Sequence, residues 1–223
     1  MAPYALAADE SCRKVKIGSM DITAHESLTW KYILNQLISG QDLGSRHVDW
    51  AMDEIMTGST PEPILASFLT SLHMKGETSE ELGALARGML AKAETIDLDV
   101  HAVDIVGTGG DQQNTVNIST MAALVIAGTG ATVVKHGNRA STSKSGSADV
   151  LEALGIQLDM PIKSVAACAR QVGITFLFAM TFHPSMRFVG PTRKILGIPT
   201  AFNYLGPMTN PARVSSSAIG VAN

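Results

Sequence analysis

The stretch that decides the fold covers residues 104–155 and reads DIVGTGGDQQNTVNISTMAALVIAGTGATVVKHGNRASTSKSGSADVLEALG. Two short β-branched runs, at residues 103–106 and 131–134, predict buried strands. A polar loop follows each run, and a helical pattern follows each loop. Strands that alternate with helices favour a mostly parallel sheet, whose loops meet at the carboxyl-terminal edge where such folds bind ligands.

The first loop is rich in glycine. Gly107, Gly109 and Gly110 permit positive φ and leave no Cβ between the backbone N–H groups and a ligand. Residues 117–120 then open the apolar run 121–127, which predicts a helix N-terminus that favours an anion. These features predict a phosphate-binding edge, although the spacings of the Walker A motif and of the dinucleotide fingerprint are missing.

The second loop consists largely of hydrogen-bond donors. We expect the strand at residues 131–134 to deliver Lys135 and His136 into it, followed by Asn138, Arg139 and several hydroxyl side chains. Such a set suits a ligand with more than one anionic group and with sugar hydroxyls. Each loop alone also fits a plain solvated connection. Their occurrence at consecutive strand ends favours the binding interpretation.

The residues before this stretch have a helical period. Apolar positions in residues 27–94 recur at helical spacing and predict a bundle of four short helices, and Thr78 with Glu81 forms a capping-box pattern. No chemistry is evident in the bundle.

The residues after it continue the α/β alternation. Residues 163–172 predict a helix and residues 174–179 a strand, so His183 is expected at the same sheet edge. Residues 186–196 can form a helix that Gly190 and Pro191 kink or split.

Bulk composition narrows the function classes. The chain has 223 residues, 45% of them hydrophobic and 17% charged, with a formal net charge of −3. This balance offers no general attraction for nucleic acid, and no apolar run is long enough for a membrane span or signal peptide. Cys12 and Cys168 have no metal-ligand spacing, so reduced thiols in a cytoplasmic protein are expected.

Several motifs together resemble a known family. They are Gly-Thr-Gly-Gly-Asp, Asn-x-Ser-Thr, Lys-His-Gly-Asn-Arg-Ala, Ser-Ala-Asp-Val-Leu-Glu-Ala-Leu-Gly, Phe-His-Pro-Ser-Met-Arg and Phe-Asn-x-Leu-Gly-Pro-Met-Thr-Asn-Pro-Ala. From about residue 25 to the end, the sequence is similar to the anthranilate phosphoribosyltransferases of tryptophan biosynthesis. The resemblance implies transfer of the phosphoribosyl group of phosphoribosyl pyrophosphate (PRPP) to the anthranilate amine.

The resemblance also implies site residues. It assigns to PRPP residues from the two loops and the helix between them: Gly107, Thr108, Gly109, Gly110, Asp111, Thr115, Asn117, Ile118, Ser119, Thr120, Lys135, His136, Gly137, Asn138, Arg139, Ala140, Ser141, Thr142, Ser143 and Ser147. It assigns to anthranilate Gly107, His136, Asn138, His183, Arg193 and Pro207. Arg193 is implied to meet the carboxylate of anthranilate, for which a guanidinium is well suited.

The same resemblance implies the mechanism, the cofactor and the partners. Ser119 matches a position that ligates Mg²⁺, a hard cation held mostly by diphosphate oxygens and water. An aromatic amine is already neutral at pH 7, so no general acid or base is assigned, and Lys135 and Arg139 are expected to act electrostatically. A homodimer formed through the helical domain is implied, with no nucleic-acid or membrane partner.

The expected fold class is α/β, with three parts along the chain. Residues 1–24 form an N-terminal extension, residues 25–97 a small helical domain completed by helices within about 184–200, and residues 98–223 a mostly parallel α/β domain. The resembled family continues beyond the position of Asn223 and includes there an Asp-Glu pair for a second Mg²⁺. We therefore expect the α/β domain to be truncated at its C-terminus, which leaves open whether this chain is active alone.

Two other functions fit parts of the pattern. A pyrimidine nucleoside phosphorylase shares the plan of a helical domain with an α/β domain and a glycine-rich phosphate loop, but it expects a Lys-x-Ser-Thr-Gly-Gly segment that residues 103–110 do not match. A non-catalytic relative that binds nucleic acid would need a basic stripe, whereas the sequence pI is about 6.0.

Overall fold

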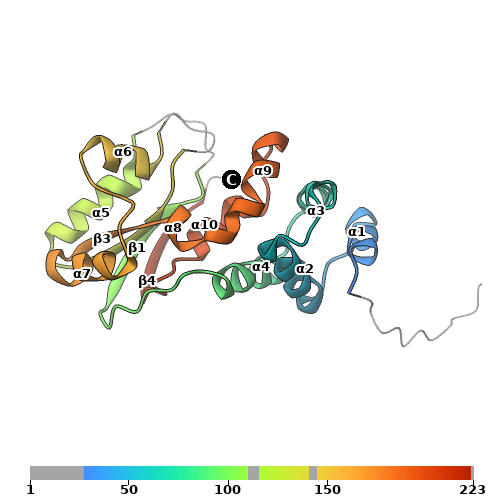
Figure 1. Ribbon diagram of the computed structural model, residues 1–223, viewed down its shortest axis with the longest axis horizontal. Helices are drawn as coiled ribbons and strands as arrows, with labels where there is room; N and C mark the ends of the chain where they lie inside the picture. Colours follow the sequence, from blue (N-terminus) through green and yellow to red (C-terminus); the bar gives the residue numbers. More distant parts are fainter. Residues whose placement is uncertain (1–27, 110–115, 141–144, 222–223) are drawn as a thin grey trace, which may run out of the picture.

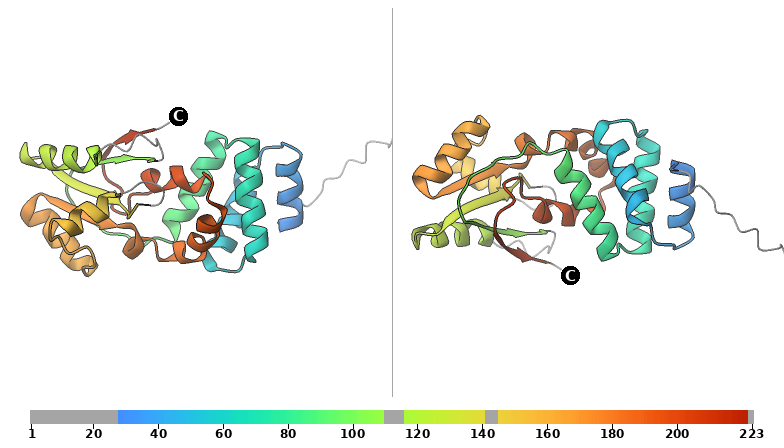
Figure 2. Two further views of the ribbon diagram at one scale, coloured as in Figure 1. Left: turned by 90° about the horizontal axis from the view of Figure 1, so that it is seen from above. Right: turned by 90° about the horizontal axis from the view of Figure 1, so that it is seen from below.

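The computed structural model describes residues 28–109, 116–140 and 145–221. A bundle of helices lies at one end of the molecule and a parallel sheet flanked by helices at the other (Figures 1 and 2). The predicted combination of a helical bundle with an α/β sheet domain is confirmed. None of the helices among these residues combines the length and the apolar character needed to cross a membrane.

Four helices build the bundle, and their ends follow from the sequence. They are α1 (Trp30–Ile38), α2 (Ser45–Thr57), α3 (Glu62–Lys75) and α4 (Ser79–Ala91). Thr29 caps α1 by accepting a hydrogen bond from the Tyr32 N–H, and α2 ends at Gly58 with a φ of 80°. The predicted capping box of Thr78 and Glu81 is confirmed at the start of α4.

The core of the bundle draws on a distant part of the chain. Its central side chains, including Ile33, Met52, Phe68 and Leu85, are fully buried. The same apolar cluster includes four residues from a segment that follows the third strand of the sheet: Val189, Ala201, Phe202 and Leu205. Burial of this shared apolar surface ties the bundle to the α/β domain.

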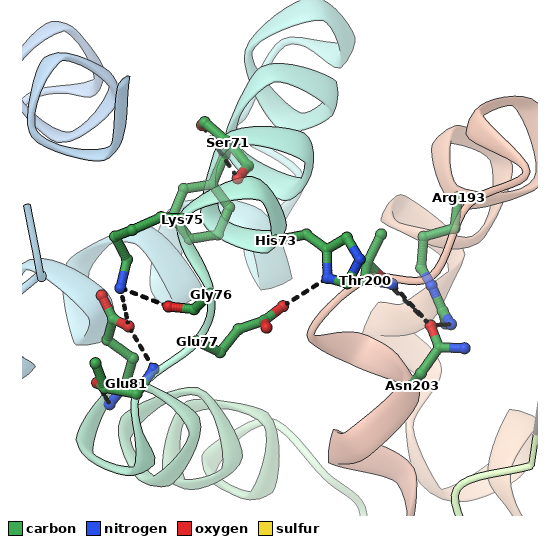
Figure 3. Close-up of polar contacts among 11 residues, drawn as sticks. Ser71, His73, Lys75, Gly76, Glu77, Glu81, Arg193, Thr200 and Asn203 are labelled. Carbon is green, nitrogen blue, oxygen red and sulfur yellow. Dashed lines mark hydrogen bonds and ion pairs between the residues drawn. The ribbon is translucent and has the colours of Figure 1, made fainter. Parts of the chain in front are cut away.

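A buried ion pair lies where α3 turns into α4 (Figure 3). The Lys75 Nζ donates to Glu81 Oε2 at 2.8 Å and to the Gly76 carbonyl, and the Glu81 side chain is fully buried. Glu81 Oε1 also accepts from the Leu43 N–H at 2.8 Å, and an exposed Asp42 carboxylate is a further acceptor for Lys75. These contacts connect the α1–α2 loop to the start of α4.

The sheet has four parallel strands in the order β3-β2-β1-β4. They are β1 (Ala102–Gly107), β2 (Thr132–Gly137), β3 (Ile174–Phe178) and β4 (Ser216–Gly220). The register pairs Val103 with Val133 and with Ser216, and Val133 with Ile174. Every residue of β4 is exposed, and β4 forms one edge of the sheet.

The connecting helices cover the two faces of the sheet. They are α5 (Ile118–Gly128), α6 (Ser147–Ala153), α7 (Ile162–Val172), α8 (Ala179–Phe182), the 3₁₀ helix η1 (Pro184–Phe188), α9 (Gly190–Leu196) and α10 (Phe202–Met208). α5, α6 and α7 lie on one face, and α10 packs against β2 and α4 between the sheet and the bundle (Figures 1 and 2). The predicted split near Gly190 and Pro191 is confirmed, because η1 ends before α9 begins.

One expectation about the second strand is wrong. β2 continues to Gly137, so Lys135 and His136 belong to the strand and are buried rather than delivered into a loop. The parallel ladder continues there because His136 pairs with Leu177 of β3 and Gly137 with Phe178. Both polar side chains find partners inside the protein, which offsets the cost of burying them.

Candidate functional site

The candidate site includes the carboxyl ends of the neighbouring strands β1 and β4. Gly107 ends β1, the Thr108 N–H donates to the Gly220 carbonyl at 2.9 Å, and Gly109 has a φ of 66° that favours glycine. Asn117 is the N-cap residue of α5, and Ser119 lies in its first turn. The glycine turn and the helix N-terminus both follow β1, as the sequence predicts for a phosphate-binding edge.

Lys135 links these elements from the neighbouring strand. Its Nζ donates to the Ile105 carbonyl at 2.5 Å and to the Ser119 Oγ at 3.1 Å. Burial lowers the pKa of Lys135 to about 8, although the nearby Asp104 carboxylate opposes this shift. The ammonium group is therefore still mostly protonated at pH 7, so a positive charge lies beside the first turn of α5.

A buried carboxylate on β1, that of Asp104, makes hydrogen bonds to β2 and to Asn210. Asp104 accepts from the His136 N–H at 3.2 Å and from the Asn210 side-chain amide at 2.8 Å. Burial raises the pKa of Asp104, while the Asn210 hydrogen bond and the Lys135 charge act in the opposite direction. Neither Asp104 nor Asn210 was among the predicted site residues. An acidic residue that shares one face of a strand with Ala102 and Val106 was the available signal.

Two histidines, His136 near the end of β2 and His183 directly after α8, lie side by side. The His136 and His183 ring centroids are 5.1 Å apart, and both side chains are buried. His136 Nδ1 donates to the Gly206 carbonyl at 3.0 Å and His183 Nε2 to the Thr209 carbonyl at 3.1 Å, because a carbonyl can only accept. The remaining ring nitrogens, His136 Nε2 and His183 Nδ1, have no hydrogen-bond partner within the described part of the chain.

Both imidazoles are held in the neutral form. Burial lowers the pKa of His136 to about 3, with a further contribution from the His183 charge, and burial lowers the pKa of His183 to about 4. Each ring therefore offers an unprotonated nitrogen that can accept a hydrogen bond from an N–H or O–H donor.

Acidification is expected to destabilise the protein through this histidine pair. The folded-state pKa values lie below the unfolded value of 6.5, so the unfolded chain binds more protons between about pH 4 and 6.5, and stability rises with pH across that window. Each histidine should contribute about 2 kcal/mol, so the free energy of unfolding should fall by about 4 kcal/mol from pH 7 to pH 5. Urea titrations of the wild type and of His183→Asn measure this.

The control for this prediction is the exposed His101. His101→Asn should keep the pH dependence of the wild type, whereas His183→Asn should remove about half of it. Equal pH dependence in all three proteins would contradict the role assigned to the buried pair.

Residues 138–140, which follow β2, pack closely against residues 146–149 at the start of α6; we call this contact the neck. Asp149 Oδ2 accepts from the Ala140 N–H at 2.9 Å and from the Gly146 N–H at 2.7 Å. Arg139 is exposed and donates through both guanidinium nitrogens to the Glu152 carboxylate, a pairing that raises its pKa. No role was predicted for Asp149 or Glu152, although an acidic residue in the first turn of a helix can accept from the N–H of the N-cap residue, here Gly146.

Arg193 lies apart from these groups, on α9. Its Nη2 donates to Asn203 Oδ1 at 3.0 Å, and the same oxygen accepts from the Thr200 N–H at 3.1 Å (Figure 3). Burial lowers the pKa of Arg193. Within the described residues no hydrogen bond joins Arg193 to Lys135 or to the two histidines. Pro207, also predicted for the anthranilate site, lies next to Gly206, whose carbonyl meets His136.

The described structure covers only part of the predicted site. Predicted residues around the neck and α5 lie close together, since the Asn117 amide donates to the Ser145 Oγ at 3.4 Å and Ser147 begins α6. Six predicted residues lie outside the described residues: Gly110, Asp111, Thr115, Ser141, Thr142 and Ser143. Across the described ranges, no group of three or more His, Cys, Asp or Glu side chains is arranged to hold a metal ion.

Comparisons with known proteins agree with this geometry. The family model described as "Glycosyl transferase family, a/b domain" matches residues 99–223, and that described as "Glycosyl transferase family, helical bundle domain" matches residues 31–93. An anthranilate phosphoribosyltransferase of an Arthrobacter species is 60% identical over 195 residues, which cover 87% of this chain and 55% of that protein. The enzyme of that name from Rhodococcus jostii is 56% identical, over 87% of this chain and 54% of the relative.

Solved structures give the same result. The anthranilate phosphoribosyltransferase of Thermus thermophilus matches with a TM-score of 0.80 and 43% identity, over 85% of this chain and 58% of that one. The enzyme from Saccharomyces cerevisiae, in complex with PRPP and Mg, matches with a TM-score of 0.81 and 34% identity, over 89% and 60%. The chain thus spans about half the length of the curated relatives it matches.

Proposed function

Because this chain belongs to the glycosyl transferase family that joins a helical bundle domain to an α/β domain, we propose that it forms the PRPP and anthranilate sites of an anthranilate phosphoribosyltransferase. One observation carries the proposal: the buried Lys135 ammonium contacts Ser119 in the first turn of α5, beside the glycine turn that follows β1. A cation beside a glycine turn and a helix N-terminus supports the binding of a diphosphate.

In the proposed reaction, the anthranilate nitrogen forms a bond to C1 of the ribose while the bond from C1 to the pyrophosphate oxygen breaks. The nitrogen then loses a proton to solvent. Lys135 and the positive end of the α5 helix dipole stabilise the negative charge that develops on pyrophosphate. The neutral His136 and His183 each keep one ring proton, which they donate to a backbone carbonyl, and their other ring nitrogen can accept an N–H hydrogen bond from an aromatic amine.

Mg²⁺ is the proposed cofactor, as in the yeast enzyme solved with PRPP and Mg. The described residues fit an ion held mainly by substrate, because Ser119 offers one hydroxyl oxygen at the start of α5 and no group of three or more His, Cys, Asp or Glu side chains among these residues is arranged to hold a metal ion by itself. When bound with PRPP, Mg²⁺ would neutralise charge on the diphosphate.

The experiment that tests the function is the PRPP- and Mg²⁺-dependent loss of anthranilate fluorescence. We would measure it with the 223-residue chain and, in parallel, with a chimera that adds the remaining sequence of the Arthrobacter relative. Turnover by either protein supports the proposal. If both are silent and neither binds PRPP by calorimetry, the proposal is wrong.

Arg193 provides a prediction specific to anthranilate. We propose that its guanidinium binds the anthranilate carboxylate, so Arg193→Ala should raise the KM for anthranilate about 30-fold and change the KM for PRPP less than threefold. Steady-state kinetics on the active form of the protein measure both constants. The exposed Arg170→Ala on α7 is the control, and an equal loss for both substrates would argue against the carboxylate role.

We also propose a cytoplasmic homodimer that associates through the helical bundle. A groove of about 640 Å³ runs between α1 and α3, and its lining residues Ile38 and Met74 are 74% and 81% exposed. Large apolar side chains at such exposure are a feature of protein contact surfaces. Light scattering of the purified chain measures its molar mass and separates a dimer from a monomer.

A further inference from the structure

The backbone on the two sides of the neck after β2 is packed without space for a side chain. A Cβ on Gly146 would lie 2.4 Å from the Ala140 nitrogen and 2.7 Å from the Asn138 carbonyl oxygen. The Ala148 N–H also donates to the Asn138 carbonyl at 3.2 Å. The places of Asn138, Arg139 and Ser147 therefore depend on how this neck is held.

One carboxylate oxygen holds both sides of the neck. Asp149 Oδ2 accepts from Ala140 on the β2 side and from Gly146 on the α6 side, at 2.9 and 2.7 Å. The other oxygen, Oδ1, lies 3.8 Å from the Arg139 guanidinium. These N–H hydrogen bonds lower the pKa of Asp149, so the side chain stays ionised and acts only as an acceptor at neutral pH.

Asp149 is negatively charged, as is the diphosphate proposed to bind at this edge of the sheet. A free carboxylate would repel a diphosphate, yet the sequence places an acidic residue directly behind the polar loop. Two N–H donors and a nearby guanidinium compensate the charge, so the carboxylate can fix the backbone at little electrostatic cost to an anionic ligand.

We propose that Asp149 is a positioning residue for PRPP: by joining the Ala140 and Gly146 N–H groups it sets the orientation of Asn138, Arg139 and Ser147 towards the ligand. This inference rests on the proposed function, because it assigns Asp149 to the PRPP half of the same site. Asp149 itself makes no contact with substrate in this proposal.

Two substitutions separate the hydrogen bonds from the charge. Asp149→Ala removes both acceptor contacts, whereas Asp149→Asn keeps an oxygen that can accept from both N–H groups. We expect Asp149→Ala to raise the Kd and the KM for PRPP about tenfold or more, with kcat and the KM for anthranilate changed less than threefold. Asp149→Asn should restore PRPP binding to within about threefold of the wild type. The control is Asp159→Ala, which removes an exposed negative charge that has no contact with the neck.

Amide hydrogen exchange reports on the neck without any ligand. The Ala140 and Gly146 amides should exchange about tenfold faster in Asp149→Ala and keep their protection in Asp149→Asn. Thermal melting of each variant verifies that the α/β domain is folded.

The result that supports the inference is weaker PRPP binding and faster amide exchange in folded Asp149→Ala, both reversed in Asp149→Asn. If the two amides are exposed in Asp149→Ala while PRPP affinity stays within threefold of the wild type, the positioning role is wrong. Unchanged amide protection in Asp149→Ala would overturn it as well. A wild-type protein that binds no PRPP would overturn the proposed function and this inference with it.

Discussion

Replacing Lys135 with Met should lower kcat/KM for PRPP about 10²- to 10³-fold, the usual loss when one preorganised charge is removed from a developing anion. Lys135 is buried between β1 and the start of α5, where its ammonium contacts the Ile105 carbonyl and Ser119. In such a site an ionic interaction is screened far less than at the surface. Met has a similar length and no charge, so the substitution removes the cation without opening a large cavity.

The measurement is anthranilate consumption at limiting PRPP, together with calorimetric PRPP binding. Because the pKa of Lys135 is about 8, activity should also decline as the pH rises through 8, and this alkaline limb should be missing in Lys135→Met. Lys163→Met changes an exposed lysine in the first turn of α7 and should behave like the wild type. Retention of kcat/KM within threefold in Lys135→Met would show that the proposed charge is not used.

The second large effect is expected on stability. Replacing Lys75 with Met should lower the free energy of unfolding by about 3–5 kcal/mol, because it leaves the Glu81 carboxylate buried without its cation. The Glu81 side chain is fully buried and that of Lys75 is 4% exposed, so solvent cannot replace the lost partner. The remaining N–H donors to Glu81, from Leu43 and Thr78, do not neutralise its charge.

Urea denaturation followed by circular dichroism measures this change. The control is Lys92→Met, which breaks an ion pair to Asp53 at 2.6 Å between side chains that are 37% and 59% exposed. Exposed pairs contribute little, so this control should lose less than about 1 kcal/mol. Equal losses in the two variants would mean that burial does not set the strength of the Lys75–Glu81 pair.

The sequence predicts most of the architecture because local signals and periodicity agree. The capping box of Thr78 and Glu81, the break at Gly190 and the parallel strands all follow from short-range patterns. The edge of the sheet that carries the ligand loops follows from the parallel topology, since all strand ends share one side.

What the sequence could not supply depends on contacts between distant residues. Lys135 and His136 look like loop residues because they are polar, yet the ladder with β3 keeps them in the strand. Asp104 gains its role from Asn210, which is 106 positions away. The contact of Asp149 with the Gly146 N–H is local, but its contact with the Ala140 N–H joins residues on the two sides of a loop, and no sequence pattern indicates it.

The exposed strand β4 has a consequence for how this polypeptide behaves in solution. β4 is paired only with β1 in the described chain, so the backbone N–H and C=O groups of its outer side are a template for another strand. The neighbouring helix α5 adds exposed apolar side chains, including Val125 at 70%. A second polypeptide that supplies a strand could extend the sheet here, and an unpaired edge of this kind favours aggregation of the purified chain.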